Sequence, residues 1–330
     1  MSDACRPNSF EGFIGQEKPK KVLQILCQAA KRKGGCVPHI LLSAGPGLGK
    51  SYLARILADE LESRLVVIYA GNIQSPDEMA KHLTQLKERD VLLLDECHSL
   101  RNRGIEEILY PALSEGQMPI IRNGYDDIMK GLGMGKKQPT ITMVKLPPFT
   151  CVGATTLTGL ISDPLRSRFA QCLTLEPYTD DELALIILNA STKMCFNLNS
   201  GFALEIARRS RGTARTALAN LKWLSDYCGG MGIPPSITAI QEAFSLKEIT
   251  PEGLTKIDIS YLSSLVEAGE PLGLSTLSAS IDESQETLAQ AIEPFLLRKG
   301  YVRKTGRGRV ATQKAIDLIT KEIQCTTNGS

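Results

Sequence analysis

The sequence predicts an α/β protein in which a mostly parallel sheet is followed by two smaller domains. Between residues 39 and 175, short apolar segments alternate with amphipathic ones, a pattern typical of parallel strands with helices on both faces. From there to about residue 250 the pattern is helical. The remainder has three helix-like segments before a short hairpin, which is the outline of a winged helix. We therefore expect domains at 1–176, 177–250 and 251–330.

Five apolar segments of the first domain have the length and composition of buried strands. They are His39–Ser43, Leu65–Tyr69, Val91–Leu94, Thr150–Ala154 and Cys172–Leu175. An insertion at residues 117–146 contains two segments that are expected to pair as a hairpin, Met118–Asn123 and Thr140–Leu146. The apolar residues between them, in Gly124–Pro139, indicate either a partner-binding tip or a poorly packed loop.

The later domains are predicted from helix and turn signals. Thr179–Glu182 has the pattern of a capping box, so a helix is expected to begin there. Gly229–Pro235 is predicted to be a loop, and Tyr301–Lys304 with Arg309–Thr312 to form the hairpin of the last domain. Further helices are expected at Gly201–Ser210, Thr213–Cys228, Tyr261–Glu267, Leu274–Ile281 and Glu286–Lys299.

The composition favours a globular, cytoplasmic protein. The net charge of +2 is close to neutral, so any basic surface must be local. Nine cysteines without a C-x-x-C pair indicate reduced thiols, and the three histidines are too dispersed to predict a metal site. The longest apolar runs, such as Leu183–Leu188, are too short to cross a bilayer, so we expect no membrane partner.

A glycine-rich motif, Ala44–Ser51, follows the first predicted strand and opens an amphipathic helix expected at Ser51–Glu62. Glycines allow backbone N–H groups to approach phosphates, and the helix N-terminus adds partial positive charge. Lys50 is placed to reach the β- and γ-phosphates of a nucleotide, and the Ser51 hydroxyl to hold Mg²⁺. The alternative is a strand-to-helix turn without a ligand, which the flanking strand and helix make less favourable.

Two acidic residues, Asp95 and Glu96, end the apolar strand Val91–Leu94. Asp95 is expected to bind Mg²⁺, mainly through water, and Glu96 to orient and deprotonate an attacking water. Taken alone, such acids end many strands that leave a core. After a phosphate-binding loop, they predict ATP hydrolysis.

Once these two motifs predict a nucleotide site, three further groups of residues become candidates for roles in hydrolysis. Thr155 and Thr156 end the next strand, where a hydroxyl suits contact with the γ-phosphate or the water, although a plain polar strand end is the alternative. Arg166 and Arg168 suit stabilisation of transition-state charge in the same subunit or across an interface, although such a pair is often a solvated surface. Arg215 opens a helix and is a candidate reporter of the nucleotide state.

A basic cluster lies between Arg298 and Lys314, with no acidic residue among its members. Such a cluster on a wing suits contacts with DNA phosphates, and it offers no pattern for reading bases. The alternative is an ordinary solvated charge run. The hairpin residues predicted to bind DNA are Arg303, Lys304, Arg307 and Arg309.

With these motifs in place, the chain resembles the RuvB family, bacterial AAA+ motors that drive branch migration of Holliday junctions. The similarity runs from about Arg6 to Ile319. It implies an AAA+ P-loop NTPase sheet, a helical lid domain and a C-terminal winged helix. The motifs that carry it are Arg6-Pro7, Phe13–Gln16, Gly45–Ser51, Asp95–His98, Glu106–Ala112, Leu146–Thr150, Gly153–Thr156, Pro164–Phe169, Ile206–Thr213 and Gly306–Thr312.

The resemblance also implies homohexameric rings around double-stranded DNA, with ATP and Mg²⁺ between subunits. Thr156 looks like the first sensor, Arg168 like the finger that reaches the neighbour's ATP, and Arg215 like the second sensor. Catalytic roles are thereby implied for Lys50, Asp95, Glu96, Thr156 and Arg168, and metal contacts for Ser51 and Asp95. Nucleotide contacts are implied for Arg6, Pro7, Gly45, Gly47, Leu48, Gly49, Lys50, Ser51, Tyr52, Tyr178 and Arg215.

The family's hairpin implies a RuvA-like junction-binding partner at residues 117–146, although here the hairpin is longer and differs in sequence. A RuvC-like resolvase is a further candidate partner. Two other functions share the ATPase motifs. One is a loader that places a different protein on DNA without translocating. The other is a scaffold that only binds nucleotide, against which the intact Lys50, Asp95, Glu96 and Arg168 argue.

Overall fold

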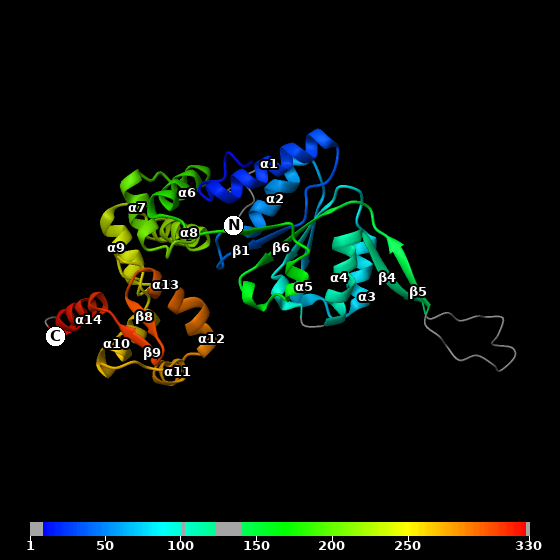
Figure 1. Cartoon of the computed structure of the whole chain (residues 1–330). Helices are drawn as coiled ribbons and strands as arrows, with labels where there is room; N and C mark the ends of the chain where they lie inside the picture. Colours follow the sequence, from blue (N-terminus) through cyan, green and yellow to red (C-terminus); the bar gives the residue numbers. More distant parts are fainter. Residues whose placement is uncertain (1–8, 101–102, 123–139, 328–330) are drawn as a thin grey trace. The chain divides into compact units, whose positions relative to one another are not determined.

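The computed structural model describes residues 9–100, 103–122 and 140–327. It divides into two compact units, shown in Figure 1. The first comprises residues 1–182 together with Thr213–Arg215, and the second comprises 183–212 and 216–330. Most of the predicted second domain and all of the predicted third domain therefore fall within one unit, and the boundary near residue 250 stays a prediction.

A five-stranded parallel sheet forms the centre of the first unit, in the order β2-β3-β6-β1-β7. This confirms the predicted fold class, and each strand bound lies within one residue of the predicted one. Because β1 lies between β6 and β7, segments far apart in the sequence meet at one sheet edge. The strands are β1 (Ile40–Ser43), β2 (Leu65–Tyr69), β3 (Val91–Asp95), β6 (Thr150–Thr155) and β7 (Gln171–Thr174).

Helices cover the sheet, and the main apolar core of this unit lies under two of them. Leu92 and Leu94 of β3 share a buried cluster with Met79 and Leu83 of α3 and Leu109 of α4. Helix α3 begins where the Ser75 hydroxyl accepts a hydrogen bond from the Glu78 amide. The helices are α1 (Glu17–Lys33), α2 (Lys50–Glu60), α3 (Pro76–Thr84), α4 (Arg103–Glu115) and α5 (Asp163–Arg166), with short 3-10 turns at Ala70–Asn72, Cys97–Ser99 and Thr158–Leu160.

A separate two-stranded sheet follows α4. Strands β4 (Gln117–Arg122) and β5 (Thr140–Lys145) pair in antiparallel fashion, from Gln117 opposite Lys145 to Arg122 opposite Thr140. This confirms the predicted hairpin pairing. The predicted tip, Gly124–Pro139, lies outside the described residues.

The helices after the sheet are α6 (Asp180–Lys193), α7 (Ser200–Arg208), α8 (Ala214–Met231) and α9 (Ile237–Ser245). The capping box at the start of α6 is confirmed, because Thr179 and Glu182 exchange side-chain-to-amide hydrogen bonds. The loop predicted at Gly229–Pro235 is wrong in its first three residues, since α8 continues through Met231. The helix ends at Gly232, which has φ 67°, and the Ile233 amide bonds back to the Cys228 carbonyl.

The last part of the second unit has the predicted winged-helix elements around one core of buried residues. A short π-helix (Leu288–Ile292) precedes Pro294, which has no N–H group to donate to a regular α-helical hydrogen bond. The elements are α10 (Lys256–Ala268), α11 (Leu274–Ile281), α12 (Gln285–Thr287), α13 (Glu293–Arg298), β8 (Val302–Thr305), β9 (Gly308–Ala311) and α14 (Gln313–Thr327).

Arg211 joins the helical segment to the winged-helix segment inside the second unit. Its guanidinium pairs with the buried carboxylate of Asp258 and donates to the Ala291 carbonyl at 3.1 Å. The same guanidinium lies 4.2 Å from the centre of the Phe295 ring. These contacts are a physical reason why the two predicted domains form one compact unit. Within the part of the chain that the structure describes, each helix is too short or too polar to span a bilayer.

Candidate functional site: a nucleotide site

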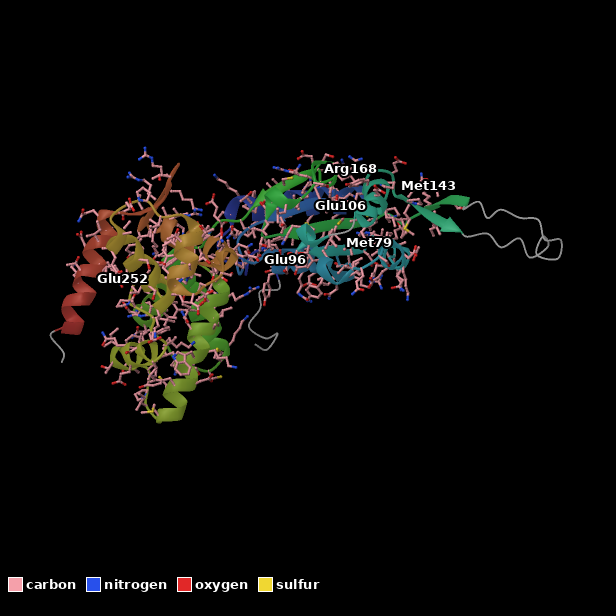
Figure 2. The ribbon with its side chains drawn as sticks, turned by 90° about the horizontal axis from the view of Figure 1, so that it is seen from below. Met79, Glu96, Glu106, Met143, Arg168 and Glu252 are labelled. Carbon is pink, nitrogen blue, oxygen red and sulfur yellow. The ribbon has the colours of Figure 1, made fainter. Side chains whose placement is uncertain are left out.

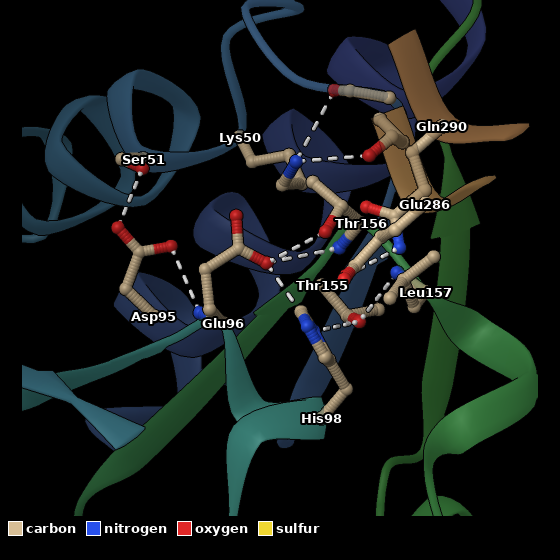
Figure 3. Close-up of polar contacts among 12 residues, drawn as sticks. Lys50, Ser51, Asp95, Glu96, His98, Thr155, Thr156, Leu157, Glu286 and Gln290 are labelled. Atoms are coloured by element: carbon tan, nitrogen blue, oxygen red, sulfur yellow. Dashed lines mark hydrogen bonds and ion pairs between the residues drawn. The ribbon is translucent and has the colours of Figure 1, made fainter. Parts of the chain in front are cut away.

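Three strand ends bring the predicted hydrolysis residues together at one edge of the sheet. The glycine-rich loop follows β1, Asp95 and Glu96 end β3, and Thr156 follows β6 (Figure 3). Because these parallel strands are neighbours, their carboxyl ends meet at the same edge. The fold class is thus what makes a site out of residues that are far apart in the sequence.

Two glycines of the loop are needed for its conformation. Gly47 has φ 78° and Gly49 has φ 100°, a region that side chains disfavour. A Cβ at Gly47 would lie 2.8 Å from Cβ of Arg215, and one at Gly49 would lie 2.8 Å from the Phe13 ring. The structure thereby places Arg215 against the loop, with its amide 3.4 Å from the Gly47 carbonyl, and its predicted nucleotide contact stays a prediction. Phe13 is a loop-supporting residue to which the sequence pattern gave no role.

Lys50 lies inside the loop that it is predicted to serve. Its side chain is buried, and Nζ donates to the carbonyls of Ala44 at 2.9 Å and Gly45 at 3.2 Å. Burial lowers the pKa of Lys50, an effect that the negative charges of Glu96 and Asp95 oppose. The ammonium is therefore a desolvated cation in a glycine-rich cradle, which suits a phosphate group.

Ser51 and Asp95 form the predicted metal pair. The Ser51 hydroxyl donates to Oδ2 of Asp95 at 3.2 Å, across the gap between α2 and β3 (Figure 3). A hydroxyl and a carboxylate are hard oxygen ligands of the kind that Mg²⁺ binds beside nucleotide phosphates. The donor set therefore fits Mg²⁺.

Glu96 is held by two neighbours at the end of the sheet. Its Oε2 accepts hydrogen bonds from the Thr156 amide at 3.1 Å and the Thr156 hydroxyl at 3.0 Å. Nδ1 of His98 lies 3.3 Å from the same oxygen and 3.1 Å from the Thr155 hydroxyl. The structure brings Thr156 and Glu96 together, and the predicted contact of Thr156 with the γ-phosphate or the water stays a prediction. His98 is a site residue to which the sequence pattern gave no role, although it lies two residues after Glu96 and within the family motif Asp95–His98.

Tyr178 supports the loop through a backbone contact. It is buried, and its hydroxyl donates to the Leu48 carbonyl at 3.2 Å. Burial raises its pKa to about 12, so the hydroxyl stays a neutral donor. Its predicted contact with the nucleotide's base stays a prediction, as does the nucleotide contact of Tyr52. The other two predicted base neighbours, Arg6 and Pro7, lie outside the described residues.

Arg168 lies at a different place in the first unit from Glu96, as the labels of Figure 2 show. It follows α5, its Nη1 donates to the Ser167 hydroxyl at 3.0 Å, and its guanidinium lies 5.5 Å from the centre of the Tyr110 ring. The catalytic residues predicted for one active site are thus split in space. Lys50, Ser51, Asp95, Glu96 and Thr156 converge, and Arg168 stands apart.

The four basic residues predicted on the wing also separate into two pairs. Arg303 and Arg307 are exposed. Arg309 donates from Nε to Oε1 of the buried Glu293 at 2.6 Å, and Lys304 pairs with its Oε2 at 2.5 Å.

The buried carboxylate of Glu293 also accepts a hydrogen bond from the Tyr261 hydroxyl at 2.9 Å. Burial pushes the pKa of Glu293 up, and the hydrogen bonds from Arg309, Lys304 and Tyr261 outweigh burial, so the net shift is downward. Lys304 and Arg309 are therefore charge-balanced within the fold, although Lys304 is itself exposed. Arg303 and Arg307 are the exposed cations of the predicted set that do not pair with Glu293.

Comparison with known proteins places this site in a family. Residues 5–175 match the model for the Holliday junction DNA helicase RuvB P-loop domain, residues 178–243 the RuvB AAA lid domain, and residues 251–320 the RuvB C-terminal winged helix domain. A Nitratiruptor protein named Holliday junction branch migration complex subunit RuvB is 40% identical over 324 residues, covering 97% of this chain and 93% of its own. The Helicobacter acinonychis protein of that name is 40% identical, over 96% and 91%.

Solved structures agree with the sequence matches. A point mutant of Thermotoga maritima RuvB is 37% identical with a TM-score of 0.84, covering 96% of this chain and 98% of its own. The structure described as the Thermotoga maritima RuvB Holliday junction branch migration motor is 36% identical with a TM-score of 0.82, over 96% and 99%. The chain therefore belongs to the RuvB family of AAA+ P-loop ATPases.

Proposed function

We propose that this protein is an ATP-driven motor that moves Holliday junctions, working as a homohexameric ring on double-stranded DNA. The observation that carries this proposal is the convergence of Lys50, Ser51, Asp95 and Glu96 at one sheet edge. The names of the relatives, branch migration complex subunits, supply the substrate.

The chemistry follows from the site's geometry. The loop amides and Lys50 bind the phosphates of ATP. Ser51 and Asp95 would hold Mg²⁺, which would supply neutralisation of charge on the transferred group. Glu96 accepts a proton from the attacking water. The contacts from Thr156 and His98 all involve Oε2, so the second carboxylate oxygen, Oε1, is the acceptor for that proton.

Arg168 completes the site from the neighbouring subunit. Its separation from Glu96 within one subunit supports a role in trans, where a guanidinium stabilises charge in the transition state (Figure 2). Hydrolysis is therefore a property of an interface. A ring in which each subunit completes its neighbour's site then couples ATP turnover to movement.

The DNA contacts are proposed from the exposed charge of the wing, and the protein partners from the family. Arg303 and Arg307, exposed on the wing, contact the phosphate backbone. The hairpin of β4 and β5 docks a RuvA-like junction-binding protein. A RuvC-like resolvase acts on the same complex.

The decisive experiment is branch migration of a synthetic four-way junction, measured with and without a RuvA-like protein. We expect ATP-dependent movement that the RuvA-like protein accelerates. The Arg168→Ala variant should bind ATP normally and lose turnover by about 10³-fold or more. DNA-stimulated turnover without junction movement in either condition would overturn the motor in favour of a loader. Full turnover by Arg168→Ala would overturn the role of this residue in trans.

A further inference from the structure

Arg168 sits on a small polar and aromatic cluster formed by Glu106 and Tyr110 of α4 and Ser162, which starts α5. We propose that this cluster positions the Arg168 guanidinium for ATP hydrolysis in the neighbouring subunit. The proposal rests on the proposed function, since it gives Arg168 the role of a finger in trans. Glu106, Tyr110 and Ser162 are positioning residues, because they act through Arg168.

One carboxylate ties the finger's helix to α4. Oε2 of Glu106 accepts hydrogen bonds from the Ser162 hydroxyl at 2.5 Å and the Tyr110 hydroxyl at 2.6 Å. The Ser162 oxygen in turn accepts from the Leu165 amide at 3.3 Å and caps α5. Ser162, at the start of the segment that leads to Arg168, is thereby fixed to α4.

The Tyr110 ring then orients the finger itself. The Arg168 guanidinium lies 5.5 Å from the centre of this ring, within the range of a cation–π attraction. Such an attraction holds the cation by the ring face and does not itself use the guanidinium N–H groups as hydrogen-bond donors. Donation of the Tyr110 hydroxyl to the Glu106 carboxylate makes the ring more electron-rich, which strengthens the attraction.

The remaining contacts of Arg168 leave it unsatisfied within its own subunit. Nη1 donates to Ser167, the adjacent residue, and buried Nε has no hydrogen-bond acceptor among the described residues. Buried polar groups of folded proteins usually have partners, so this rotamer of Arg168 leaves Nε unsatisfied, and a rotation of the side chain toward an outside acceptor would relieve that cost. An anionic phosphate of the neighbour's nucleotide is the acceptor that the proposed function supplies.

The first test separates the ring from its hydroxyl. Tyr110→Leu removes the aromatic face and should lower kcat about tenfold, while Tyr110→Phe keeps the face and should lower it about threefold. Glu106→Gln should resemble Tyr110→Phe. In all three variants the dissociation constant for ATP should stay within about twofold of the parent value, because the nucleotide is bound by the subunit's own loop. Glu107→Gln is the matched control, since this exposed neighbour on α4 lies outside the cluster.

The second test asks where the cluster acts. In mixtures of Tyr110→Leu with Glu96→Gln protein, some interfaces combine an intact Glu96 with an intact finger, so turnover should exceed the sum of the separate proteins. A mixture of Arg168→Ala with Glu96→Gln should behave in the same way. An unchanged dissociation constant for ATP shows that Tyr110→Leu is folded. If Tyr110→Leu does not fold, Tyr110→Phe replaces it in the mixture with Glu96→Gln.

The two proposals fail in different ways. Full turnover by Arg168→Ala, or no recovery in its mixture, would remove the role in trans and the cluster with it. If Arg168→Ala behaves as expected but Tyr110→Leu and Glu106→Gln keep full kcat, only the cluster proposal is wrong. A loss in Tyr110→Leu that the mixture does not restore would likewise overturn it, because the tyrosine would then act within its own subunit.

Discussion

The nucleotide site and the wing both concentrate charge, but they use it in opposite ways. At the nucleotide site, Lys50, Asp95 and Glu96 lie where neighbouring parallel strands end, and few internal partners balance them. On the wing, the buried Glu293 binds two of the four cations and neutralises them within the fold. Charge thus serves chemistry in the first region and largely serves folding in the second. The predictions that follow test this difference, from the largest effect to the smallest.

The largest effect is expected at Glu96. Replacing it with Gln keeps the shape and the hydrogen bonds from Thr156 but removes the base, so turnover should fall by about 10²- to 10⁴-fold. Binding of ATP should remain, whereas Lys50→Ala should lose it. The measurements are steady-state turnover and nucleotide titration for both variants. If Glu96→Gln retained full turnover, Glu96 would not be the base for ATP hydrolysis.

A loss of stability is expected at Glu293, with no direct effect on hydrolysis. Glu293→Gln leaves Arg309 and Lys304 without their anionic partner and should destabilise the protein by about 2 kcal/mol. The cost is below that of a fully buried pair because the Lys304 side chain is 49% exposed. Chemical denaturation measures it. An unchanged unfolding free energy, with reduced turnover at saturating ATP, would contradict the structural role.

The same carboxylate should make stability depend on pH. The folded protein holds the pKa of Glu293 below its ordinary value of about 4.3, so its contribution is present above that value and is lost as the pH falls through the lower, folded value. Between about pH 5 and pH 3, the melting temperature of the parent protein should therefore fall more steeply with decreasing pH than that of a variant without this carboxylate. The Glu293→Gln variant, which cannot titrate there, provides the comparison. Equal slopes in the two proteins would argue against the buried network.

The smallest effect separates the two kinds of basic residue on the wing. Arg307→Ala should reduce the salt dependence of DNA binding by about one counterion and leave stability unchanged, because this side chain is exposed. Arg309→Ala should instead lower stability, since Arg309 is tied to Glu293. Binding titrations at several salt concentrations, with thermal unfolding of both variants, check the pair. If both variants changed only the salt dependence of DNA binding, the distinction between exposed and paired cations on the wing would be wrong.

The order of elements was predictable because local patterns encode it. Apolar segments with glycine or acidic residues at their ends identified the five strands of the sheet and the loop Ala44–Ser51. Parallel pairing then required Asp95, Glu96 and Thr156 to meet the loop, so this part of the site followed from fold class and motif. The end of α8 was not predicted, because two glycines suggest a turn while Gly232 alone adopts the left-handed conformation that ends the helix.

Side-chain partners far apart in the sequence were not predictable in the same way. His98 and Phe13 lie in motifs that identify the family, but their contacts with Thr155 and Gly49 depend on strand order and packing, which the motifs do not reveal. A carboxylate such as Glu293, sixteen residues before Arg309, reads as one more surface charge until the fold buries it. The same holds for Glu106, which meets Ser162 only because α5 returns to α4.

The sequence by itself therefore determined the class of the fold, the phosphate-binding loop and the acidic strand end, because each depends on residues that are close together in the chain. Only the tertiary structure decided which charges are free to act. It left Arg303 and Arg307 exposed, bound Lys304 and Arg309 to Glu293, and set Arg168 on the ring of Tyr110 away from Glu96. The physical reason is that the strength and availability of a charge depend on its burial and its partners, and both are fixed by contacts between distant segments.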